Sequence, residues 1–240
     1  MPSYTLGFYR ISRPFNDATT SAVLTALDRL EMGFFPLTLV TSESAEVSLS
    51  RPADYQREML PEGYFIDAAT ATIPLTAKNG VSLTFTESST PRLIPASVVL
   101  QFSSATLVQN EWKLDRLMQL FEGVIRAFEP EYAYGFDNAH AQRREYRTRM
   151  FQFDRLAVPI GLFWLNYYGS RWMDNLGRDR LERVCQEAAF CKWLASDGVL
   201  LAIQEVPYEE ADATHKQRQE RMEARLGLQE AQARFPNPGL

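Results

Sequence analysis

The chain has 240 residues, of which 45% are apolar and 23% are charged. This composition is ordinary for a folded domain and argues against an intrinsically disordered chain. The formal net charge of −5 argues against a globally basic nucleic-acid-binding protein and suits a basic protein partner.

The N-terminal residues lack the basic start, the long apolar stretch and the small-residue cleavage site of a signal peptide. The longest nearly apolar run, 158–168, is much shorter than the roughly 20 residues that a bilayer-spanning helix needs. We therefore expect a cytoplasmic protein without membrane association. In a reducing cytosol, Cys185 and Cys191 are expected to be free thiols.

Hydrophobic spacing and turn residues predict the elements along the chain. Strands are expected at 4–11, 37–41, 81–86, 96–102, 158–168, 190–194 and 199–204. Helices are expected at 17–32, 53–59, 110–128, 179–189 and 207–226, with Asn110 capping the third of them. Apart from the short helix, segment 42–74 is expected to be irregular, and segment 131–155 is expected to be a polar connection.

These elements do not alternate regularly between strand and helix. The sequence therefore favours an α+β fold, in which helices pack on a mainly antiparallel sheet in mixed strand–helix order. We expect residues 1–206 to form a single domain, with room for two sub-lobes that divide near residues 130–157. Residues 207–240 are expected to form a charged C-terminal helix and a loose tail.

Catalytic and metal-binding motifs are sparse. His140 and His215 lie in polar stretches outside any nucleophile motif, Cys185 and Cys191 are wrongly spaced for zinc, and no glycine-rich phosphate loop follows a strand. We expect no catalytic residue, no metal, no cofactor and no enzymatic activity. Paired carboxylates such as Glu209–Glu210 leave open an enzyme that uses convergent carboxylates in a cleft.

An arginine cluster is interleaved with aromatic side chains that could stack on bases. Its members are Arg143, Arg144, Arg147, Arg149 and Arg155. A nucleic-acid-binding module that uses this cluster is the alternative function. The interspersed acids and the negative net charge favour a solvated face or an internal salt-bridge network instead.

The segment from Val158 to Gly169 reads VPIGLFWLNYYG. It resembles the Pro-x-Gly-x-x-Trp-x-x-Tyr-x-Gly stretch of the bacterial immunity protein 52 family. The matching positions, which we expect to be structural, are Pro159, Gly161, Trp164, Asn166, Tyr167 and Gly169. The strand and polar loop at 83–90 and the long helix at 114–128 have similar counterparts in that family, in the same order.

The resemblance implies an antitoxin of polymorphic-toxin or type VI secretion systems. Such an immunity protein binds and neutralises a cognate secreted bacterial toxin, here a restriction-endonuclease-like nuclease, by occluding its active site or holding it in an inactive assembly. An acidic surface suits the basic groove of a nuclease, and no direct nucleic-acid contact is expected. The candidate partner-binding groups are Asp54, Glu58, Glu62, Glu205, Glu209, Glu210 and Asp212.

Overall fold

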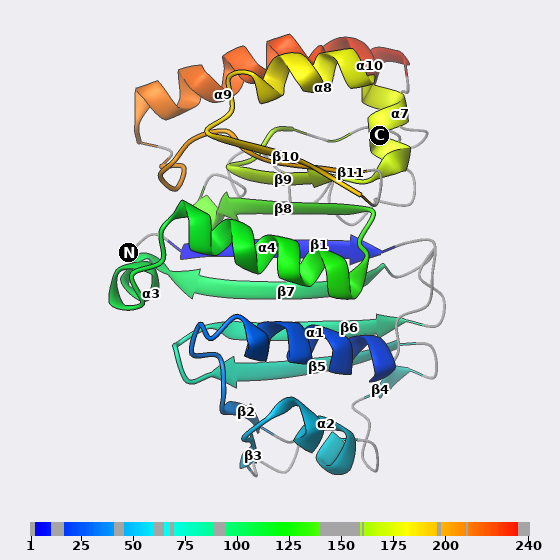
Figure 1. Ribbon diagram of the computed structural model, residues 1–240, viewed down its shortest axis with the longest axis vertical. Helices are drawn as coiled ribbons and strands as arrows, with labels where there is room; N and C mark the ends of the chain where they lie inside the picture. Colours follow the sequence, from blue (N-terminus) through cyan, green and yellow to red (C-terminus); the bar gives the residue numbers. More distant parts are fainter. Residues whose placement is uncertain are drawn as a thin grey trace. The chain divides into compact units, whose positions relative to one another are not determined.

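A computed structural model describes residues 3–10, 17–40, 46–59, 65–67, 70–88, 95–139, 159, 161–195, 198–209 and 211–234. It confirms an α+β fold with helices packed on a mainly antiparallel sheet (Figure 1). The chain divides into two compact units, one of Gly7–Pro130 and the other of Pro2–Leu6 with Glu131–Leu240.

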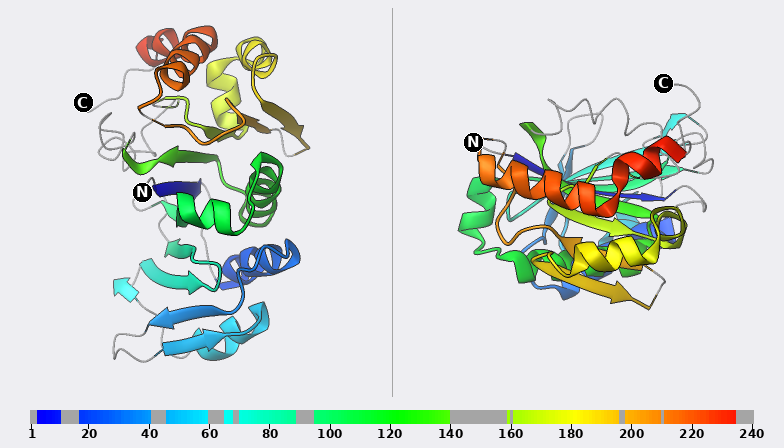
Figure 2. Two further views of the ribbon diagram at one scale, coloured as in Figure 1. Left: turned by 90° about the vertical axis from the view of Figure 1, so that its left-hand side faces the viewer. Right: turned by 90° about the horizontal axis from the view of Figure 1, so that it is seen from above.

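In the first unit the strands follow the order β1-β7-β6-β5-β2-β3, and β4 pairs with β5. The strands are β1 (Ser3–Arg10), β2 (Leu37–Val40), β3 (Glu46–Leu49), β4 (Phe65–Asp67), β5 (Thr70–Ala77), β6 (Ser82–Ser88) and β7 (Ala96–Ser103). The helices are α1 (Asp17–Arg29), α2 (Pro52–Met59), α3 (Ser104–Gln109) and α4 (Leu114–Phe128). Figure 2 shows α1 and α4, which pack against each other, on the same side of these strands.

Helix α4 forms where the sequence predicts a long amphipathic helix. Its buried face comprises Leu117, Met118, Leu120, Phe121, Val124, Ile125 and Phe128. The Phe121 ring lies 4.7 Å from that of Phe8, centroid to centroid. Gly123 lets α1 and α4 approach closely, because an added Cβ would come 3.3 Å from Leu30 Cδ1. The helix ends at Glu129, which adopts a left-handed φ of 50°.

Two sequence expectations are wrong in the first unit. Asn110 ends α3 instead of capping α4: its Nδ2 donates to the carbonyl of Thr106 at 2.8 Å, and the residue that precedes α4 is Lys113. Segment 42–74 holds not only the expected short helix but also β3, β4 and the start of β5. Strand β3 pairs with β2, and strand β4 pairs with β5. Both strands are too short for an alternation of apolar and polar residues to reveal them in the sequence.

In the second unit the strand order is β10-β11-β9-β8. The strands are β8 (Tyr132–Asp137), β9 (Leu165–Tyr168), β10 (Phe190–Leu194) and β11 (Gly198–Ala202). The helices are α7 (Ser170–Leu176), α8 (Arg178–Cys185), α9 (Ala213–Leu226) and α10 (Leu228–Arg234). Helices α8 and α9 lie side by side (Figure 1), and the expected hairpin of β10 and β11 is confirmed as an antiparallel pair.

Strand β8 was not expected, because segment 131–155 reads as a polar connection. Every residue of β8 is buried, and the strand pairs antiparallel with β9. The Tyr132 ring is stacked between the rings of Tyr168 and Trp172, at centroid distances of 5.6 Å and 4.8 Å. A strand buried on both faces shows no alternation of apolar and polar residues, so its periodicity could not reveal it.

The strand expected over 158–168 is shorter in the structure. Only Leu165–Tyr168 form β9, because the side chain of Asn166 binds the backbone just before the strand. The Phe163 N–H donates to Asn166 Oδ1 at 2.9 Å, and Asn166 Nδ2 donates to the Phe163 carbonyl at 2.7 Å. These bonds make a local turn where the sequence suggests a continuing strand.

Helix α9 starts later than expected. It begins at Ala213, not near Pro207, because the Asp212 carboxylate caps it. Asp212 Oδ1 accepts hydrogen bonds from the N–H groups of Thr214 at 2.8 Å and His215 at 3.4 Å. An aspartate in this geometry is a favoured helix N-cap, so Glu209 and Glu210 precede the helix.

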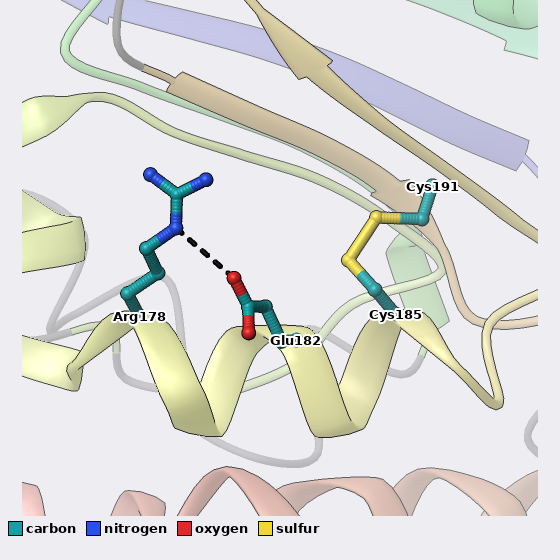
Figure 3. The surroundings of a disulfide bond; sticks show 4 residues. All are labelled: Arg178, Glu182, Cys185 and Cys191. Atoms are coloured by element: carbon teal, nitrogen blue, oxygen red, sulfur yellow. Dashed lines mark hydrogen bonds and ion pairs between the residues drawn. A yellow bond between two sulfur atoms is a disulfide. The ribbon is translucent and has the colours of Figure 1, made fainter.

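The expectation of two free thiols is also wrong. A disulfide bond joins Cys185, the last residue of α8, to Cys191 in β10 (Figure 3). Their Cα atoms lie 5.3 Å apart, within the usual range for a disulfide. The sequence spacing did not reveal this bond, because it depends on the chain turning back after α8 to form β10.

Candidate partner-binding surface on the second unit

The residues that carry the family resemblance lie inside the second unit. The buried set is Pro159, Gly161, Trp164, Asn166, Tyr167 and Gly169. Trp164 Nε1 donates to the Gln204 carbonyl at 3.1 Å, which satisfies the indole N–H. The Gly169 N–H donates to the Glu131 carbonyl at 3.0 Å, and an added Cβ would come 2.9 Å from that oxygen. These residues therefore hold the backbone in place and offer little surface to a partner.

The stretch before β9 is held by side chains of the last two helices. The Leu162 N–H donates to Glu223 Oε1 at 3.0 Å, and Gln219 Nε2 donates to the Leu162 carbonyl. Gln232 Nε2 donates to the Pro159 carbonyl at 2.9 Å. Helices α9 and α10 thereby satisfy backbone groups that have left the strand ladder.

One stripe of α9 carries arginines that converge on Glu187. Arg218 Nη2 donates to the Glu187 carbonyl at 2.7 Å, and its Nε donates to the Ile203 carbonyl at 2.6 Å. Arg225 Nη2 lies 2.5 Å from the Glu187 carboxylate and Arg221 Nε lies 3.5 Å from it. The spacing of three and four residues places these side chains on one side of the helix.

Another stripe of α9 carries carboxylates and faces a cavity. The cavity has a volume of about 360 Å³ and lies where α9 meets α10. Its lining is Glu220, Glu223, Ala224, Gly227, Leu228, Gln229, Glu230 and Gln232. Arg180 from α8 fixes the turn, since it donates to the Gly227 carbonyl at 3.0 Å and pairs with Glu230 at 2.7 Å.

Three of the candidate acids lie in the described segment between β11 and the first residue of α9. We call Glu205, Glu209 and Asp212 the acidic segment. Glu205 and Glu209 are exposed, and Val206 between them is 54% exposed. The N–H of Asp212 donates to the Glu209 carbonyl at 3.0 Å. The segment therefore exposes an apolar side chain, Val206, next to Glu205 in sequence and three residues before Glu209.

Two groups in or near the acidic segment have shifted pKa values. The hydrogen bond from the Thr214 N–H, followed by that from the His215 N–H, lowers the pKa of Asp212. The pKa of Tyr4 is raised to about 12, mainly by burial and with smaller contributions from the charges of Asp137 and Glu209. Asp212 thus stays ionised at neutral pH, and the Tyr4 hydroxyl stays neutral.

Of the other candidate acids, only Asp54 has a described side chain. Asp54 is 7% exposed and caps the start of α2, where it accepts from the Arg51 N–H at 3.1 Å. Glu58 lies in α2, but its side chain falls outside the described residues. Glu62 and Glu210 lie outside the described residues as well.

The arginine cluster at 143–155 and His140 also fall outside the described residues. The nucleic-acid alternative therefore stays a prediction, as does the reading as a carboxylate enzyme. His215 is partly buried, and its Nδ1 accepts from the Glu209 N–H at 3.1 Å.

Two general features of the described residues bear on the class of site. Among them, no group of three or more histidine, cysteine, aspartate or glutamate side chains is placed to hold a metal ion. Within the same residues, no helix has the length and apolar character needed to cross a membrane.

Comparison with known proteins gives a structural likeness but no sequence match. No protein-family model matches the chain, and no curated protein matches it. The fold is similar to that of a solved structure described as Pseudomonas aeruginosa T6SS protein PA0821, with a TM-score of 0.59. The two chains are 14% identical, and the match covers 94% of this chain and 72% of the other. At this identity the likeness shows a shared fold.

Proposed function

We propose that the chain is an immunity protein associated with a type VI secretion system, which binds and neutralises a cognate secreted toxin. The observation that carries the proposal is the similarity of the fold, over 94% of the chain, to a protein described as belonging to such a system. The segment Val158–Gly169, which resembles the immunity protein 52 family, supports the same class. In this role the chain acts by binding and is not an enzyme.

The proposed partner is a nuclease toxin with a basic groove. Glu205 and Glu209 are exposed beside Val206, so the acidic segment combines a small apolar contact with charges that attract a basic surface. The cavity between α9 and α10 is lined by three further carboxylates, those of Glu220, Glu223 and Glu230. Glu223 also accepts from the Leu162 N–H and Glu230 also pairs with Arg180, so Glu220 is the main addition. A surface of this kind would compete with the phosphate backbone for the toxin's groove without contacting nucleic acid itself.

Co-expression tests the proposal directly. The product of the gene next to that of this chain is tested as the toxin, and it is expressed in the bacterial cytoplasm with and without the chain. We expect the toxin alone to stop growth and degrade DNA, and the chain to restore growth and to co-purify with the toxin. Continued killing with no recoverable complex would overturn the proposal.

A cell-free assay separates neutralisation from binding. Purified chain is titrated against the toxin in a plasmid-cleavage assay, with bovine serum albumin as a protein control. We expect inhibition to be complete near equimolar amounts, because each chain occupies one toxin. Binding without inhibition would leave a toxin-associated protein and contradict the immunity role.

A further inference from the structure

The disulfide closes a short loop on the surface of the second unit. Cys185 ends α8, Cys191 lies in β10, and we call residues 186–189 between them the clasp loop. Both cysteine residues are partly exposed, which places the disulfide near the surface of the unit. A surface position favours exchange with a thiolate in solution.

The clasp loop is also where α9 is anchored. Glu187 lies within this loop. Its carbonyl accepts a hydrogen bond from Arg218 at 2.7 Å, and its carboxylate forms an ion pair with Arg225 at 2.5 Å. Arg221 Nε lies 3.5 Å from the same carboxylate. A single residue of the loop thus holds three arginines from one side of α9.

The disulfide lies at one end of a two-point attachment between α8 and β10. At the other end, the Arg178 guanidinium lies 4.6 Å from the centroid of the Trp193 ring. Figure 3 shows Arg178 and its ion pair with Glu182 on the same helix as Cys185. Strand β10 is last in the strand order, so it has a neighbouring strand on one side only among the described strands. The disulfide therefore restrains a strand that has fewer hydrogen-bonded neighbours than β9 or β11.

We propose that Cys185–Cys191 is a redox-responsive clasp that controls how firmly the clasp loop and the arginine side of α9 are held. A dithiol reductant of the thioredoxin class attacks one sulfur, forms a mixed disulfide and is released as its own disulfide by its second thiol. The protein bond accepts two electrons and two protons and becomes two cysteine thiols. Oxidation of the two thiols by a disulfide-bonded partner reverses the reaction.

Reduction changes one side of α9 and leaves the other attached. Without the covalent link, the clasp loop gains conformational freedom, and Glu187 no longer presents its carbonyl and carboxylate in fixed positions. The opposite side of α9 keeps the bonds of Gln219 and Glu223 to Leu162. Reduction therefore loosens the loop and the arginine contacts locally, while the second unit stays folded.

Redox titration and hydrogen exchange test the clasp on the full chain. The protein is equilibrated in buffers of reduced and oxidised glutathione, alkylated and weighed by mass spectrometry. We expect a two-electron transition to an intramolecular disulfide. Amide exchange in residues 186–190 and at the arginine side of α9 is expected to become severalfold faster on reduction, while exchange in α4 stays unchanged.

Two variants make the result specific. Cys185→Ser/Cys191→Ser should match the reduced protein and should not respond to reductant. Glu187→Gln in the oxidised chain should speed exchange at the arginine side of α9 while leaving the disulfide intact. The proposal is overturned if no intramolecular disulfide forms at any glutathione ratio, or if the oxidised and reduced proteins exchange alike. These readouts need no toxin, so they stand apart from the proposed function.

Discussion

The ring of Tyr167 in β9 lies so close to Gly198 in β11 that a Cβ built on Gly198 would come 2.4 Å from Tyr167 Cε2. Tyr167 is only 3% exposed, so its ring has little room to move aside. We predict that Gly198→Ala lowers the free energy of unfolding by about 1–3 kcal/mol. Urea denaturation of the variant measures this loss.

A second substitution identifies the cause of that loss. Tyr167→Leu removes the ring that the new methyl group would meet. In a double-mutant cycle, Gly198→Ala should lower the free energy of unfolding by less in the Tyr167→Leu background than in the wild-type chain. Equal costs in both backgrounds would show that the ring contact is not responsible.

Asn166 is fully buried and serves both backbone polar groups of Phe163. We predict that Asn166→Ala lowers the free energy of unfolding by about 2–4 kcal/mol, because two buried groups lose their partner. Tyr168→Phe is the matched control, since it removes the 3.3 Å hydrogen bond from the Tyr168 hydroxyl to Asn166 Oδ1 and leaves the Asn166 side chain in place. Its cost should stay near 1 kcal/mol or below. The prediction is wrong if the two variants unfold at the same urea concentration.

Tyr4 makes stability depend on pH in the alkaline range. Burial is the main reason that its pKa rises to about 12 in the folded chain, whereas an unfolded tyrosine ionises near 10. Between these values the unfolded state binds fewer protons than the folded state. The free energy of unfolding should therefore be unaffected below pH 10 and fall as pH rises toward 12, by at most about 2–3 kcal/mol.

Tyr4→Phe isolates that contribution, because the variant has no hydroxyl to ionise. Its unfolding free energy should fall less steeply over the same pH range than that of the wild type. Glu209→Gln should lower the tyrosinate titration midpoint of Tyr4, since the charge of Glu209 helps to raise the pKa. An unchanged alkaline slope in Tyr4→Phe would refute the assignment.

The acidic segment gives a prediction about binding. Glu205→Lys/Glu209→Lys should weaken association with a basic toxin, mainly through slower association and most clearly at low salt. Asp28→Lys/Glu46→Lys is the control, because both of these acids are exposed in the first unit and the change in charge is the same. Surface plasmon resonance at two ionic strengths distinguishes the pairs. A similar loss in both variants would point to net charge and not to this surface.

Helices with a clear apolar stripe could be predicted from the sequence, and strands buried on both faces could not. The spacing of Leu117, Phe121 and Val124 indicates α4, and the structure buries those side chains. Gly33, a residue type that favours helix ends, has a positive φ of 74°, although the first helix ends at Arg29 and not at the expected residue 32. Strand β8 shows neither signal, because the partners of Tyr132 come from distant parts of the chain.

The candidate site likewise has features that the sequence predicts and features that it does not. The sequence identifies Glu205 and Glu209 as acidic groups near a helix, and the structure exposes both. The arginine stripe of α9 could have been found from its spacing alone. Glu187, the residue that these arginines bind, could not have been identified from the sequence. It contacts them only after the chain has folded back past α8.

The second unit takes residues from both sides of the first in sequence, since it combines Pro2–Leu6 with Glu131–Leu240. Its irregular stretch at Leu162 also depends on Gln219 and Glu223 of α9. On the ribosome, the contiguous first unit can fold while synthesis continues, because its residues end at Pro130. The second unit must wait for its last helices to emerge, which leaves its apolar strands exposed for longer. Chaperones that bind nascent chains would therefore meet the two halves of this protein in very different states.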